Sequence, residues 1–203
     1  MSQLTVLFSE KPRIYTGVEL RPHFLLTELG MKGTALGAFI GACDVKTEHL
    51  VDWEDRLVSD HIRAGKMVHL IGEFFGIPLR EGVWIQRWMV AKLLEDLTAR
   101  MCEAGSPAKL RRDGDDIFIS HAGLAGLAGK DERKLTVSIV TASPVSILFH
   151  LGINVDPSGA PVPAIGLQEL GIDASKWIGS FLENVKQEWN GIEWACAKVR
   201  PVV

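Results

Sequence analysis

Two apolar runs joined by a very short connection constrain the fold of this chain more than any other feature. Residues 135–141 and 145–155 are rich in apolar and β-branched side chains, and Ser143-Pro144 lies between them. A connection this short joins antiparallel neighbours, because parallel strands need a crossover of a dozen or more residues. The second half of the chain therefore predicts antiparallel strands.

The rest of the chain alternates helical and strand patterns. Apolar residues at a 3.6-residue period predict a long helix over 82–103 and another over 176–189, with Trp84, Trp88, Trp177 and Trp189 facing inward. Asp173 or Ser175 is expected to cap the second helix, and a shorter helix over 20–29 is expected to end at Gly30. Further strands are expected over 4–8, 13–15, 34–45, 66–75, 109–120 and 193–199, and a Gly- and Ala-rich loop over 121–129.

This order of elements predicts an α+β fold with a mixed, mainly antiparallel sheet. The helices are expected to pack on one face, which leaves the other face for a ligand. Glycines within residues 34–45 indicate a strand that another backbone or a ligand approaches closely. At 203 residues, of which 47% are hydrophobic, the chain is expected to form a single domain over 1–203.

Charge and cysteine content exclude several classes of protein. The net charge of −3 offers no broad attraction to phosphate backbones or anionic membranes, so neither nucleic acid nor membrane is an expected partner. Cys43, Cys102 and Cys196 are far apart and odd in number, which favours reduced thiols. Residues 1–12 do not resemble a signal peptide, and the expected location is the cytoplasm.

Charged and polar residues on neighbouring predicted strands form the main candidate site. The segment 111–116 contains Arg112, Asp115 and Asp116, while Lys134, Ser138 and Asn154 lie on the strands that follow. We expect Arg112 and Lys134 to converge in a mostly dry recess that suits a small, negatively charged ligand. The alternatives are a salt-bridged turn, an edge-strand lysine, and buried polar groups that satisfy the backbone.

A second candidate pair lies on the strand predicted over 66–75. His69 and Glu73 share a face with Met67 and Ile71, whereas Val68, Leu70 and Phe74 face the other way, toward the core. His69 and Glu73 are therefore expected on the open side of the sheet, as ligand contacts or as an acid/base pair. The alternative is a hydrogen-bonded pair on an ordinary exposed face.

The polar connection over 44–60 is the most acidic segment of the chain. Its candidate metal ligands are Asp44, Glu48, His49 and Asp52, since carboxylates with one imidazole suit magnesium, manganese or zinc. The alternative is a solvated loop, because a run of charge without a recognised ligand spacing is usually exposed.

The carboxyl-terminal two thirds of the chain resembles biotin protein ligases and, more loosely, lipoate ligases and class II synthetases. Those ligases have, in order, a strand, a helix, a Lys-Trp-Pro-Asn-Asp turn, an Arg-Lys-Leu strand, a Gly-Ile-Asn strand end and a Leu-Gln-Glu helix entry. The matching segments here are 66–75, 82–103, 112–116, 133–135, 152–154 and 167–169. The whole chain resembles a small prokaryotic family labelled as a domain of unknown function, with the same type of fold.

The resemblance implies roles for individual residues. Arg112 falls where those ligases have the lysine that contacts the activated carboxylate, and Asp115 falls at their asparagine. Arg112 and Lys134 are thus the candidate catalytic residues; the candidate ligand-binding residues are His69, Glu73, Asp115, Asp116, Ser138 and Asn154. Because such ligases often pair through sheet edges, the resemblance also implies a homodimer.

One departure from the ligases bears on the cofactor. Their Gly-Arg-Gly-Arg-Arg-Gly phosphate loop is replaced here by the acidic residues 47–56, which repel a triphosphate unless divalent metal ions intervene. The sequence therefore argues against ATP. The leading hypothesis is a ligase- or acyltransferase-like protein that binds a small acidic metabolite and transfers or activates an acyl group. The alternatives are a non-catalytic ligand-binding or scaffold protein without the phosphate loop, and a metal-dependent hydrolase that uses the acidic loop.

Overall fold

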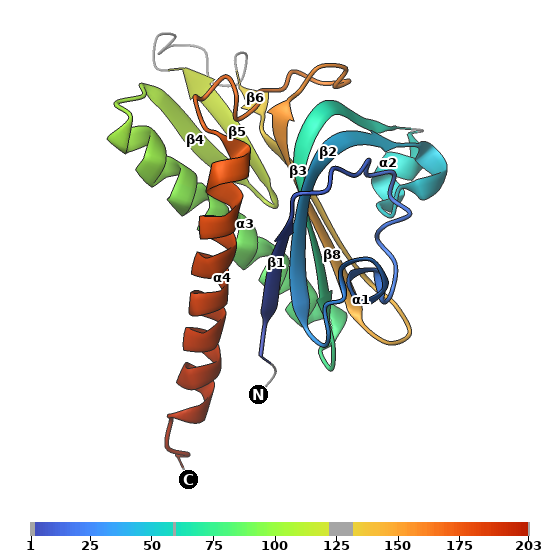
Figure 1. The fold of residues 1–203 in the computed structure, drawn as a ribbon, viewed down its shortest axis with the longest axis vertical. Coiled ribbons are helices and arrows are strands. Elements are labelled where there is room, and N and C mark those ends of the chain that lie inside the picture. The colour runs from blue at the N-terminus through green and yellow to red at the C-terminus, as the bar shows by residue number, and fades with distance from the viewer. Residues whose placement is uncertain (1–2, 59, 122–131, 203) are drawn as a thin grey trace.

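A computed structural model describes residues 3–58, 60–121 and 132–202, and they form two sheets (Figure 1). The large sheet has the order β1-β2-β3-β8-β7 and the small sheet the order β4-β5-β6. The large-sheet strands are β1 (Thr5–Ser9), β2 (Ala35–Val45), β3 (Ile62–Phe74), β7 (Thr136–Ala142) and β8 (Ile147–Asp156). The small-sheet strands are β4 (Ala108–Asp113), β5 (Asp116–His121) and β6 (Arg133–Lys134). Strands β1 and β2 pair in parallel and the other pairs are antiparallel, as the sequence predicts.

The two long helices cover one face of the large sheet. Helices α3 (Leu79–Glu103) and α4 (Ala174–Ala197) pack there on the main hydrophobic core (Figure 1). Asp173 caps α4, and its carboxylate accepts hydrogen bonds from the amides of Ser175 and Lys176. The opposite face carries the short helices α1 (Phe24–Leu29) and α2 (Trp53–Leu57) and a 3-10 turn, Thr47–His49. The second face is therefore not open, contrary to expectation. No helix within the described ranges is long and apolar enough to cross a lipid bilayer.

Strand β3 separates the two cores by simple alternation. Val68 and Leu70 enter the core under α3 and α4, whereas Met67 and Ile71 belong to the second cluster on the α1 side. The predicted facing of β3 is confirmed. His69, however, is completely buried on that second face.

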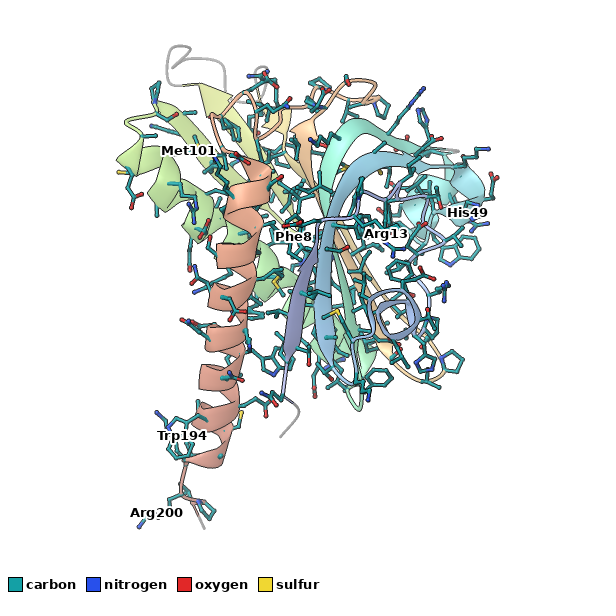
Figure 2. The ribbon with its side chains drawn as sticks, in the orientation of Figure 1. Phe8, Arg13, His49, Met101, Trp194 and Arg200 are labelled. Carbon is teal, nitrogen blue, oxygen red and sulfur yellow. The ribbon has the colours of Figure 1, made fainter. Side chains whose placement is uncertain are left out.

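A close backbone approach brings the amino-terminal segment onto the second face. Tyr15 pairs with Cys43 in an isolated bridge, and a Cβ atom at Gly41 would overlap the carbonyl oxygen of Arg13. Arg13 lies on the side of the sheet that carries α1 (Figure 2). The predicted close approach to this strand is thus correct, but residues 13–15 contribute a bridge rather than the expected strand.

Three further expectations need correction. Residues 109–120 form a β4-β5 hairpin instead of one strand, because the two-residue loop Gly114-Asp115 turns the chain with a positive φ of 62° at Gly114. The strand expected over 193–199 is wrong: α4 continues to Ala197, since alanine and glutamate extend an existing helix readily. Trp84 is 65% exposed rather than in the core. The loop expected over 121–129 lies almost entirely outside the described residues.

Candidate functional site

A cavity of about 270 Å³ lies where the two sheets meet, beneath the segment that contains α2. We call it the junction cavity. Its position follows from the chain path: β6 pairs with β5 of the small sheet, and Leu135 then leads directly into β7 of the large sheet. Among the residues predicted for a site, those that line this cavity are His49, Asp52, Asp115, Asp116, Lys134, Ser138 and Asn154.

A hydrogen-bond network holds Asp115 at one end of the cavity. The Gln86 side-chain amide donates to the Asp115 carboxylate at 2.8 Å and to the Ser138 hydroxyl at 2.9 Å, and Ser138 donates to Asp115 at 3.0 Å. Arg87 lies 3.2 Å from the other Asp115 oxygen. Gln86 was not among the residues predicted for the site, although a polar residue among the apolar positions of α3 is a detectable signal. These contacts fix the carboxylate in one orientation.

Lys134 and Asp116 form an ion pair within the cavity wall. Their charged atoms are 2.8 Å apart, and each side chain is about one quarter exposed, at 27% and 26%. Burial raises the pKa of Asp116, and the nearby carboxylates of Asp115 and Asp55 raise it further, against the opposing effect of Lys134. The side-chain amide of Asn154 donates to the Lys134 backbone carbonyl at 3.2 Å, which supports the strand that presents the lysine.

Arg112 does not reach the cavity. In the hairpin register it opposes Ile117, whereas Lys134 opposes Phe118, so the two cations project from opposite faces of the small sheet. Arg112 is exposed, and its guanidinium donates to the backbone carbonyl of Gly114 at 2.8 Å. The expected convergence of Arg112 and Lys134 is therefore wrong, and this placement does not support a catalytic role for Arg112.

A stack of three buried rings lies against the cavity on the α1 side. The Tyr15 and His150 rings are stacked, with their centroids 3.9 Å apart and an angle of 11° between their planes. His150 Nε2 lies 3.1 Å from His69 Nδ1. Tyr15 and His150 line the cavity, whereas His69 lies behind them. Burial lowers the pKa of His69 to about 4 and the pKa of His150 well below its ordinary value. Both imidazoles are therefore neutral near pH 7.

Glu73 has a separate, structural position. Both oxygens of its carboxylate lie 3.0 Å from the His23 backbone amide, which donates to them. The Ser146 hydroxyl also donates to this carboxylate, at 2.7 Å, and Glu73 is 3% exposed. These bonds hold His23, which has a positive φ of 62°, before α1. Neither His69 nor Glu73 lies on the open side of the sheet, and Glu73 is not paired with His69, so the expected acid/base pair is not formed.

The four predicted metal ligands are not brought together as a set, although His49 and Asp52 both line the junction cavity. Asp44 pairs in register with Arg63, and Asp52 accepts the Glu54 amide at 2.7 Å as the cap of α2. His49 lies on the α2 side of the molecule (Figure 2). Within the part of the chain that the structure describes, no group of three or more His, Cys, Asp or Glu side chains is placed to hold a metal ion. The metal set of Asp44, Glu48, His49 and Asp52 is therefore not supported.

The segment over the cavity adds a wall of carboxylates. Asp52, Asp55 and Asp60 line it, and burial together with the charges of Asp52 and Asp60 raises the pKa of Asp55. Among the described lining residues, five aspartates face two cations, Arg63 and Lys134. The cavity is therefore acidic, opposite to the anion-binding recess expected from the sequence. Asp55 and Asp60 were not among the residues predicted for the site, although both lie in the acidic connection over 44–60.

Comparison with known structures defines the class of fold. A candidate lipoate protein ligase of T. acidophilum with bound lipoic acid superposes with a TM-score of 0.53 and 11% identity, over 93% of this chain and 86% of that one. The fold is thus similar to that of a lipoate protein ligase, and the α+β expectation is confirmed. At this level of identity the likeness concerns the fold alone.

The chain belongs to the family described as Domain of unknown function (DUF366), whose model matches residues 4–200. A protein of unknown function from Pyrococcus horikoshi has a TM-score of 0.83 and 35% identity, covering 98% of this chain and 100% of that one. An uncharacterized protein of Methanocaldococcus jannaschii is 27% identical over an alignment 206 residues long, which covers 98% of this chain and 86% of the relative.

Proposed function

We propose that this protein binds a small polar metabolite in the junction cavity. The observation that carries the proposal is the convergence of oriented polar side chains on one concave space: Asp115 held by Gln86 and Ser138, and Asp116 held by Lys134. A few fixed polar groups in a concave space are typical of small-molecule sites. The raised pKa of Asp116, despite its lysine partner, is a further property that functional sites share.

Acyl activation or transfer is the reaction that the ligase-like fold favours, and Lys134 is the residue best placed to assist it. Lys134 lines the cavity and its ammonium group is held by Asp116, so it can contact a carbonyl oxygen of a bound ligand. Lipoic acid, the ligand of the T. acidophilum neighbour, is one compound to test. The acidic wall gives a triphosphate no favourable electrostatic contact, which is why ATP is not part of the proposal.

Native mass spectrometry of the purified protein tests the proposal, followed by identification of any compound that it retains. We expect one small metabolite to bind to the wild type and to be lost, or weakened about tenfold, in Asp116→Asn. Asp113→Asn is the matched control, since Asp113 opposes Asp116 in the same hairpin but lies outside the cavity. If the wild type retains no compound and binds none of a panel that includes lipoate, amino acids and amines, the proposed function is incorrect.

A further inference from the structure

We propose that the ligand of the junction cavity is a nitrogen compound with several N–H donors, such as an amidine, guanidine or amino-substituted ring, which contacts Asp55 and His150. The inference rests on the proposed function and names the chemical class of the ligand. It replaces the acidic metabolite that the sequence favours, because Arg112 lies outside the cavity and Lys134 is already paired with Asp116.

The tautomer of His150 follows from its neighbours. His69 Nε2 lies 3.4 Å from the Gly41 carbonyl oxygen, which only accepts, so Nε2 carries the proton. In the neutral ring His69 Nδ1 then accepts, and His150 Nε2, at 3.1 Å, is the donor. His150 Nδ1 is consequently left with a free lone pair. Within the described residues, His69 is the hydrogen-bond partner of His150, and nothing donates to Nδ1.

Tyr15 provides a second buried polar group at the same wall. The residue is 3% exposed, and its hydroxyl forms no hydrogen bond with any described residue. Burial also raises the pKa of Tyr15, so the hydroxyl keeps its proton. Among the described residues, the fully buried side-chain atom without a partner is Arg13 Nε, so the Tyr15 hydroxyl and His150 Nδ1 are instead accessible from the cavity that their residues line. A bound ligand can therefore form hydrogen bonds with both groups.

Asp55 supplies the charge that selects the ligand. Its carboxylate forms no ion pair within the described ranges. Burial, and then the charges of Asp52 and Asp60, raise its pKa against the opposing effect of Lys134. A cationic ligand relieves this repulsion, whereas a carboxylate ligand increases it. Carboxylates and an unprotonated imidazole nitrogen are all acceptors, so together they favour a ligand that donates at several points.

Three probes of nearly equal shape separate charge from size: benzamidine is a cation with several N–H donors, benzamide is neutral, and benzoate is an anion. Isothermal titration of the full-length protein is expected to rank benzamidine tightest, with benzoate weaker by about tenfold or more. Asp55→Asn should weaken benzamidine binding about tenfold. Glu54→Gln is the control, because it removes the same charge from the neighbouring exposed position that does not line the cavity.

Nitrogen NMR of the histidine-labelled protein provides a readout that a structural role alone would not move. We expect the His150 spectrum of an Nε2–H tautomer, and a shift of its Nδ1 resonance when benzamidine is added. Equal or tighter binding of benzoate, or benzamidine affinity unchanged in both Asp55→Asn and His150→Phe, would overturn the inference while the proposed function stands. A retained metabolite without N–H donors has the same consequence. No retained compound and no binding of any probe would instead contradict the proposed function itself.

Discussion

Lys134 and Asp116 form a diagonal cross-strand pair: Lys134 opposes Phe118 in the register of β5 and β6, and its ammonium group reaches back two residues to the Asp116 carboxylate at 2.8 Å. The pair places one positive charge among the carboxylates of the junction cavity. Lys134 is thus expected to have two roles, stabilising the ionised form of Asp116 and contacting a ligand, and experiments can distinguish them.

We predict that Lys134→Ala destabilises the protein by about 1 kcal/mol, because the pair is partly exposed and solvent screens it. The pKa of Asp116 should rise further in this variant, since the lysine lowers it. A double-mutant cycle with Asp116→Ala, measured by urea denaturation, gives the coupling free energy. Additive effects of the two substitutions would show that the ion pair contributes nothing to stability.

Arg112→Ala is expected to leave both stability and ligand binding unchanged. The guanidinium is exposed, contacts a backbone carbonyl of its own turn, and projects from the opposite face of the small sheet to Lys134. Titration of this variant with benzamidine and lipoate, beside the wild type, checks the prediction. A tenfold loss of affinity for either compound would contradict the prediction and indicate that Arg112 contributes to ligand binding.

The buried His69 should make stability fall as the pH is lowered. Its pKa is about 4 in the folded protein and near 6.5 when unfolded, so between these values the unfolded state binds more protons. The stability from His69 is present above about pH 6.5 and is lost toward pH 4, by roughly 3 kcal/mol. The raised pKa values of Asp55 and Asp116 act in the opposite direction.

His69→Gln isolates this contribution, because glutamine can donate to Gly41 but does not titrate. Urea denaturation of both proteins at about pH 7 and about pH 5 is the measurement. We expect the wild type to lose more stability than the variant over this interval. An equal loss in the two proteins would assign the pH dependence to other groups.

Glu73→Ala is expected to destabilise the protein by about 3 kcal/mol, because it leaves the buried Ser146 hydroxyl and His23 amide without their acceptor. Glu73→Gln keeps one acceptor oxygen and should cost less. Thermal unfolding of the two variants tests the order. Equal stability of both with the wild type would mean that the positive φ at His23 needs no support from Glu73.

Gly41→Ala should be the most damaging single substitution on β2, since an added Cβ atom meets the Arg13 backbone and displaces the segment that carries Tyr15. Gly179→Ala is the matched control: its Cβ meets nothing within 4 Å in α4, and alanine favours a helix by about 1 kcal/mol. Circular dichroism melting of both variants decides the matter. A Gly41→Ala protein as stable as Gly179→Ala would contradict the close approach.

Much of the fold follows from the local order of side chains. The short connection at Ser143-Pro144, the apolar period of α3 and the alternation along β3 correctly predicted the antiparallel strands, the long helix and the division of the β3 side chains between two faces. Each of these predictions depends on the spacing of apolar residues over a few positions, and the backbone geometry of a helix or strand places residues at that spacing on the same face. Where a short apolar run fits both periods, as over 193–199, the sequence pattern alone chose wrongly.

The sign of the charge in the junction cavity could not be predicted from local sequence patterns. Whether Arg112 and Lys134 meet depends on a turn at Gly114 and on a one-residue difference in register, which reverses the face of every side chain. Asp55 and Tyr15 reach the cavity only because segments distant in sequence fold over the same face of the sheet. The sequence thus determined which residues share a face of each element, while long-range packing selected the groups that meet at the cavity and hence the sign of its charge.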